Sequence, residues 1–199
     1  MVRAYFVTIG HYGFWLPNDE RGSGSKYVGS KALLPYGEAT YIAERRRSRA
    51  SRAYHKQTRR FAKEALKYPP VYLTGQQAWC VAQGFKETIR TTGCPILAAC
   101  VMPDHTHLVL PRHKYSVEKL VIQLKGDATQ YLKAAGCHPF QNESPREDGR
   151  LPTIWGRGSW NVFLSEAWQV RRKIRYTKEN PVKLGFPRQV WHFVTPFER

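Results

Sequence analysis

The sequence predicts an α+β domain with a central antiparallel sheet and helices on one face, as in a split β-α-β unit. Three observations support this fold. A segment rich in β-branched and aromatic residues opens the chain, two apolar segments in mid-chain are joined by a tight turn, and amphipathic helical segments alternate with them. At 199 residues the chain fits one domain. We expect that domain to span residues 1–199, with a basic insertion or elaborated connection at about 23–70.

Residues 3–9 contain β-branched and aromatic side chains and predict a first strand. Gly10 and a stretch rich in glycine, proline and aromatic residues follow, reaching Gly22 and including Trp15. Loops of this composition usually run over the protein surface. Two interpretations remain open: the aromatic side chains close over the core, or residues such as Trp15 stack on nucleic-acid bases.

A strongly basic segment lies between Glu44 and Arg60, with few helix breakers, and predicts a very polar helix that continues toward Lys67. Like charges with so few acids repel one another, which favours a phosphate-bearing partner over a merely solvated helical face. The basic residues are Arg45, Arg46, Arg47, Arg49, Arg52, Lys56, Arg59 and Arg60. We expect the seven arginines among them to bind the backbone of DNA.

Residues 74–90 have the pattern of an amphipathic helix. Thr74 is a suitable N-cap and Gly93 a suitable stop signal. Apolar side chains recur every three or four positions and predict one buried stripe, formed by Ala78, Val81, Phe85 and Ile89.

Two strands are predicted next. Residues 94–102 are almost continuously apolar, so we expect a strand in the middle of the sheet. Pro103 and Asp104 make a tight turn, and residues 105–110 form the hairpin partner.

A further amphipathic helix begins after Ser116 and ends before Gly136. Its stripe consists of Val117, Leu120, Val121, Leu124, Ala128 and Leu132, and Tyr131 lies near enough to this stripe to be expected in the core. Residues 137–160 resemble a loop, with a short strand expected within 155–163.

The last predicted helix is capped by Ser165, runs from Glu166 toward Asn180 and is stopped by Pro181. A spacing of four places Arg172, Tyr176 and Asn180 on one face. Another face, formed by Val170, Ile174 and Thr177, is expected to pack on the sheet.

His105 and His107 are two residues apart in the predicted strand, so both side chains project from the same face and can share one divalent metal. Taken alone, a histidine pair is better explained by two hydrogen-bonded imidazoles than by a metal site. Thr106 between them points to the opposite face, so its identity should not affect the pair.

The composition of the chain indicates which classes of partner it can bind. Lys and Arg number 32 against 15 Asp and Glu, a net charge of +17, and such a charge attracts polyanions such as nucleic acid. No apolar run approaches the roughly 20 residues needed to span a bilayer, and the first residues lack the pattern of a signal peptide. The four cysteines form no C-x-x-C pair, which argues against zinc-ribbon spacing and favours a reducing compartment.

Several motifs resemble the single-tyrosine HUH transposases, and among these the REP-associated tyrosine transposases. The motifs are His105-Thr-His107 after an apolar strand, the pair Lys125-Gly126, the string Tyr176-Thr-Lys-Glu-Asn-Pro-Val-Lys183, and the early stretch Gly13-Phe-Trp-Leu-Pro-Asn-Asp-Glu-Arg-Gly22. The tyrosine string is the most specific of them. The resemblance implies the ferredoxin-like HUH endonuclease fold, with the tyrosine on a C-terminal helix.

The resemblance also implies a site. His105, His107 and Asn180 would hold a divalent metal, Mg²⁺ or Mn²⁺. Tyr176 would be the nucleophile that attacks single-stranded DNA, leaving a 5′-phosphotyrosyl enzyme and a free 3′-hydroxyl. A metal on the phosphate neutralises developing charge and aligns the displacement. The substrate would be a hairpin formed by REP-like palindromes.

Further expectations concern binding and assembly. Besides the basic segment, we expect Lys125, Arg171, Arg172, Arg175 and Trp15 to contact DNA. The resemblance fits a monomer or a homodimer in the bacterial cytoplasm, associated with the nucleoid and not with a membrane. Two alternatives remain: a domesticated, non-catalytic protein that only binds DNA hairpins, and a zinc-dependent hydrolase, for which no HExxH motif or cysteine pair supplies the ligands.

Overall fold

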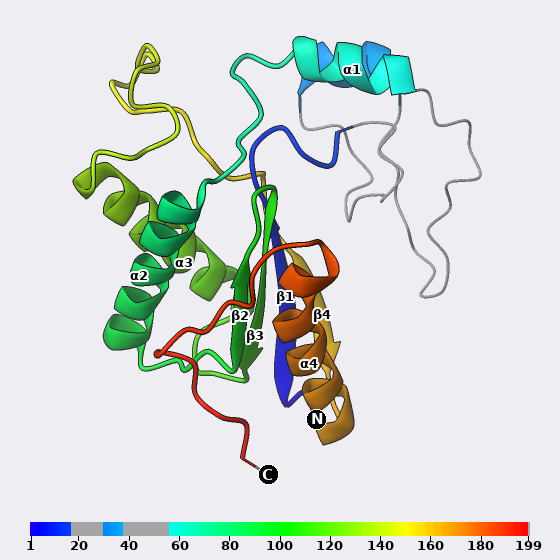
Figure 1. Cartoon of the computed structure of the whole chain (residues 1–199), viewed down its shortest axis with the longest axis vertical. Coiled ribbons are helices and arrows are strands. Elements are labelled where there is room, and N and C mark those ends of the chain that lie inside the picture. The colour runs from blue at the N-terminus through cyan, green and yellow to red at the C-terminus, as the bar shows by residue number, and fades with distance from the viewer. Residues whose placement is uncertain (17–29, 38–55, 199) are drawn as a thin grey trace.

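The computed structural model describes residues 1–16, 30–37 and 56–198. Within these residues the strands form one antiparallel sheet in the order β2-β3-β1-β4 (Figure 1). The strands are β1 (Ala4–Gly10), β2 (Ala98–Val101), β3 (His105–Pro111) and β4 (Trp160–Leu164). The predicted α+β class, the antiparallel sheet and the hairpin of β2 and β3 are confirmed.

Helices cover both faces of this sheet (Figure 1). The pair α2 (Gly75–Thr92) and α3 (Val117–Ala134) packs on the face that carries Val7 and Leu108. Helix α4 (Ala167–Lys183) packs on the other face, against Phe6 and Val109. The expectation that helices lie on one face is therefore wrong. The reason is that the inner strands alternate between two apolar faces, and each face must be covered.

Helices α2 and α3 form where the periodicity predicts them. Thr74 caps α2 through a capping box with Gln77, and Gly93 ends the helix in the left-handed conformation, with φ of 73°. The buried side chains of α3 are those of the predicted stripe. The two helices cross closely at Gly84, where a Cβ would lie 2.3 Å from the Cα of Ala128.

Strand β2 lies at an edge of the sheet and not in the middle, so that prediction is wrong. Its apolar residues are buried because the C-terminal segment covers the open edge. The Gln189 side chain accepts a hydrogen bond from the N–H of Val101 and donates one to its carbonyl, at 2.8 and 2.7 Å. The N–H of Thr195 donates to the carbonyl of Ile96 at 2.9 Å. Continuous hydrophobicity therefore reports burial on both faces and not a central position.

Helix α4 differs from its predicted bounds at both ends. Glu166, and not Ser165, is the N-cap, because the Gln169 side chain accepts hydrogen bonds from both backbone N–H groups. Pro181 lies within the last turn, and the helix continues to Lys183. A proline there removes only one backbone hydrogen bond, and Pro181 itself is buried.

The described part of the predicted basic insertion contains the short helix η1 (Lys31–Tyr36) and α1 (Lys56–Glu64). Leu16, Leu33 and Ala62 form a small apolar cluster between them. Residues 44–55 of the predicted basic helix lie outside the described residues.

Candidate functional site

Helix α4 places Tyr176 against the face of the sheet that carries the histidine pair. The ring centroids of Tyr176 and His107 are 5.4 Å apart, and those of His105 and His107 are 4.6 Å apart. All of these residues belong to the same chain. The structure thus brings together side chains that are about 70 residues apart in the sequence.

Hydrogen bonds hold both imidazoles in place. Nδ1 of His105 lies 2.6 Å from the carboxylate of Asp104, an arrangement that directs Nε2 away from the carboxylate. Nδ1 of His107 lies 2.9 Å from Oγ1 of Thr8, its partner in the strand register. Burial, together with the nearby positive charges of His105 and Lys173, lowers the pKa of His107 to about 3. His107 is therefore neutral at physiological pH, as a metal ligand must be.

Asn180 supplies the observation that fits a bound cation. It lies one turn after Tyr176 and is only 6% exposed. Its Oδ1 has no hydrogen-bond partner among the described residues. A buried carbonyl oxygen without a partner is costly, and a divalent metal would satisfy it. The predicted donor set, two imidazoles and this amide oxygen, would suit Mn²⁺ better than Mg²⁺.

The zinc-hydrolase alternative requires a third ligand beside the histidine pair, because catalytic zinc sites are built from three His, Cys, Asp or Glu ligands. In the described parts of the chain no group of three such side chains is placed to hold a metal.

Thr106 points away from the histidine pair, as predicted, and meets a buried residue that sequence reasoning missed. His11 donates its Nδ1–H to the carbonyl of Pro103 at 2.9 Å, and its Nε2 lies 3.3 Å from the hydroxyl of Thr106. Burial lowers the pKa of His11 to about 4, against a smaller opposite effect of the Pro103 carbonyl. A neutral imidazole therefore joins the first strand to the turn before His105.

Two further residues of the site were also missed. Phe6 stacks on His107 with centroids 5.0 Å apart and meets Tyr176 edge-on at 5.7 Å. The ammonium of Lys173 lies 4.2 Å from the centroid of the Phe6 ring and 5.3 Å from that of Tyr176. Their sequence signals are weak. Phe6 is two residues before Thr8 in β1 and so lies on the same face of the sheet, and Lys173 precedes Tyr176 by three positions on the helix.

The arginines predicted to bind DNA are found in three situations. Arg171, Arg172 and Arg175 are exposed on α4 beside Tyr176. In α1, Arg60 pairs with Glu64 at 3.2 Å, and Arg59 lies on the same helix. The remaining predicted arginines lie outside the described residues: Arg45, Arg46, Arg47, Arg49 and Arg52.

Lys125 and Trp15 are engaged within the protein. The ammonium of Lys125 donates to the carbonyls of Gly156 and Gly158 at 3.0 and 2.5 Å, and burial lowers its pKa to about 8. Trp15 has a φ of 54° and covers Gly10, where a Cβ would come within 2.6 Å of the indole ring. Both side chains therefore fix loops around the end of β1, and any contact with DNA remains a prediction.

Tyr131 is not a core residue, so that prediction is wrong. It is 38% exposed, compared with 39% for Tyr176. Leu132, the next residue, takes the buried position of α3, and Tyr131 lies at the margin of the apolar stripe. The two tyrosines differ in their neighbours and not in their accessibility, because only Tyr176 contacts His107.

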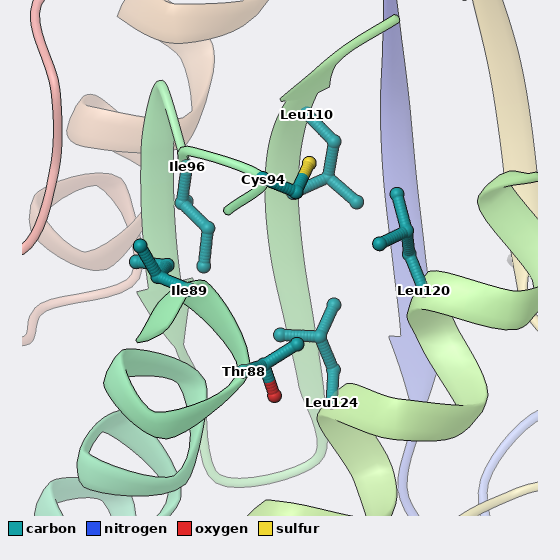
Figure 2. A pocket seen from close by; sticks show the side chains of 7 residues that line it. All are labelled: Thr88, Ile89, Cys94, Ile96, Leu110, Leu120 and Leu124. Carbon is teal, nitrogen blue, oxygen red and sulfur yellow. The ribbon is translucent and has the colours of Figure 1, made fainter. Parts of the chain in front are cut away.

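A small apolar pocket lies elsewhere, between α2, α3 and the sheet (Figure 2). Its lining includes Cys94, and burial raises the pKa of that thiol to about 11. The other lining residues are Thr88, Ile89, Ile96, Leu110, Leu120 and Leu124. This pocket is a packing defect on the opposite face of the sheet from Tyr176 and lacks the groups that chemistry needs.

Comparison with known proteins agrees with the fold. Over 104 residues the chain is 28% identical to a protein of Haemophilus influenzae named "Putative REP-associated tyrosine transposase", an alignment that covers 51% of this chain and 57% of that protein. The chain therefore matches little more than half the length of this relative. A solved structure of a REP-associated tyrosine transposase bound to a REP hairpin shares the fold, with a TM-score of 0.50 and 16% identity over 96% of this chain and 74% of that one.

A family model adds the decisive match. Residues 46–158, more than half of the chain, match the model described as IS200-like transposase. The matched region contains the histidine pair and ends before α4, which carries Tyr176. Within the described residues no helix is long and apolar enough to cross a membrane. The chain belongs to the family of IS200-like transposases.

Proposed function

We propose that this chain is a metal-dependent endonuclease and strand transferase for single-stranded DNA, acting through a 5′-phosphotyrosine at REP-like hairpins. One observation carries the proposal: Tyr176 contacts the neutral imidazole of His107, and Asn180, one turn further along α4, has a buried Oδ1 without a partner among the described residues. Membership in the transposase family supports the reaction class, and a solved relative named for its bound REP hairpin supports the substrate.

In this mechanism His105, His107 and Asn180 would hold the metal. A bound Mg²⁺ or Mn²⁺ would neutralise charge on the scissile phosphate. The Tyr176 oxygen bonds to phosphorus and loses its proton, while the bond from phosphorus to the 3′-oxygen breaks and that oxygen takes up a proton. Attack by a 3′-hydroxyl on the phosphotyrosine reverses these changes and joins DNA.

The chain's own residues prepare this reaction. Asp104 and Thr8 fix the orientations of the two imidazoles, so little movement is needed when the metal binds. Phe6 limits the ring of Tyr176 from one side. Because Tyr176 contacts the histidine of its own chain, the site is proposed to be complete in a monomer, and a homodimer is not required for chemistry.

The phosphate path is proposed to follow α4. Arg171, Arg172 and Arg175 surround Tyr176 and are exposed, as expected for side chains that contact a DNA backbone. Arg172 also lies over the ring of Trp168 at 4.9 Å, and Trp168 is 53% exposed. An exposed indole beside a guanidinium offers a surface on which a base can stack.

The test is covalent trapping with REP-type hairpin oligonucleotides in Mn²⁺ or Mg²⁺. Wild-type protein is expected to form a protein–DNA adduct that is lost in EDTA, and Tyr176→Phe is expected to form none. Tyr131→Phe is a matched control, because this tyrosine is equally exposed but does not contact the histidines. Loss of the adduct in Tyr131→Phe instead would move the nucleophile to α3. Tight hairpin binding without any adduct would support the non-catalytic role.

A further inference from the structure

Lys173 is a cation inside the candidate site with no counter-ion in the part of the chain that the structure describes. Its ammonium lies over the rings of Phe6 and Tyr176, at 4.2 and 5.3 Å from their centroids. It makes no hydrogen bond or ion pair with any described residue. By contrast, Lys183 on the same helix pairs with Glu179 at 2.8 Å. Lys173 thus lies over the tyrosine ring without an anionic partner among the described residues.

This arrangement is costly as it stands. Burial, and then the charge of Arg172, lower the pKa of Lys173, which shows that the ammonium has lost part of its hydration without gaining a partner. Two aromatic faces return only part of that loss, since a cation–π contact contributes about 0.5–2 kcal/mol. An anion placed beside the ammonium would recover the rest.

The position of Lys173 also separates it from the arginines of α4. Arg171, Arg172 and Arg175 are exposed, whereas Lys173 is half-buried and turned onto the sheet. Lys173 precedes Tyr176 by three residues, so the two side chains are neighbours on the helix surface. An anion that contacts both must lie in the angle between α4 and the sheet, next to His107, whose pKa already responds to the charge of Lys173.

We propose that Lys173 binds the phosphodiester that Tyr176 attacks, as a catalytic residue of the site and not as part of the general DNA-binding surface. The proposal rests on the proposed function. Negative charge on the non-bridging phosphate oxygens is redistributed during displacement, and a cation already fixed beside them stabilises the transition state without reorganisation. Lysine suits this role because its ammonium is a compact point charge.

Three variants test the role. Lys173→Met keeps the length and apolar stem that pack on Phe6 but removes the charge, and Lys173→Arg keeps the charge. Lys178→Met is the matched control, because Lys178 is exposed on the same helix. Each protein is checked by its thermal unfolding, and then two quantities are measured separately: hairpin affinity, and the single-turnover rate of adduct formation at saturating DNA.

We expect Lys173→Met to slow adduct formation by about 100-fold, the scale found when one preorganised donor is removed from a transition state. Hairpin affinity should change by no more than about 3-fold, Lys173→Arg should recover part of the rate, and Lys178→Met should match wild type. A normal rate in Lys173→Met, or a loss confined to affinity, would overturn the proposal while leaving the proposed function intact. Failure of wild type to form any adduct would overturn both.

Discussion

The buried imidazole of His11 makes the stability of the fold depend on pH in a calculable way. In the folded chain burial lowers its pKa from 6.5 to about 4. Below pH 6.5 His11 is therefore protonated in the unfolded chain but stays neutral in the folded chain. The free energy of unfolding consequently falls as the pH falls toward 4. Each pH unit of such a difference is worth 1.36 kcal/mol, so His11 alone accounts for about 3 kcal/mol over this window.

The substitution His11→Gln isolates this contribution. Glutamine can donate to the Pro103 carbonyl but does not titrate. Urea unfolding followed by circular dichroism from pH 7.5 to 4 gives the free energy of unfolding of each protein. The wild type should lose about 3 kcal/mol more than the variant as the pH falls. His107 also has a lowered pKa, but it is present in both proteins and cancels in the difference.

His192→Gln is the control for replacing an imidazole by an amide at an exposed position. Parallel profiles for wild type and His11→Gln, including profiles offset by a constant amount, would refute the reasoning, because they would show that folding does not change the proton affinity of His11. A constant offset would measure only the packing lost with the imidazole.

Other predictions concern packing and metal binding. Gly84→Ala should destabilise the fold by about 1–3 kcal/mol, because its Cβ meets the backbone of α3, whereas Gly126→Ala, with open space around it, should stabilise by about 0.5–1 kcal/mol; chemical denaturation distinguishes them. Leu124→Ala, at the pocket in Figure 2, should cost about 2–5 kcal/mol in the same assay. Asn180→Ala should weaken Mn²⁺ binding in calorimetry, and Asn180→Asp should retain it. If the two variants bind Mn²⁺ with the same affinity, Asn180 does not belong to the metal site.

Local patterns predicted the elements well, because periodicity and capping act over a few residues. The stripe of α3, the cap at Thr74 and the hairpin before His105 follow from adjacent sequence, whereas only Val81 and Phe85 of the predicted α2 stripe are among the buried residues of that helix. The position of a strand within the sheet does not follow from adjacent sequence. The edge placement of β2 depends on Gln189, 88 residues away from Val101, and no local pattern reports that pairing.

The residues of the candidate site also divide into those that local sequence predicts and those that it does not. His105 and His107 follow from strand alternation, and Tyr176 and Asn180 from helical spacing together with the family resemblance. Phe6 and Lys173 could not be predicted, because their role arises where α4 crosses the sheet. For Lys125 the structure adds a role within the protein, since its ammonium donates to two backbone carbonyls, and its contact with DNA stays a prediction.

The C-terminal segment that covers β2 protects the sheet from other chains. An uncovered edge strand presents a row of backbone donors and acceptors, and a flat apolar one templates aggregation. A chain shortened after α4 would lose Gln189 and the Thr195 bond, and would expose the Ile96–Val101 backbone. Such a truncation would expose an edge strand that can pair with other chains. A loss of activity in the truncated protein would therefore be explained by aggregation as readily as by an effect on DNA.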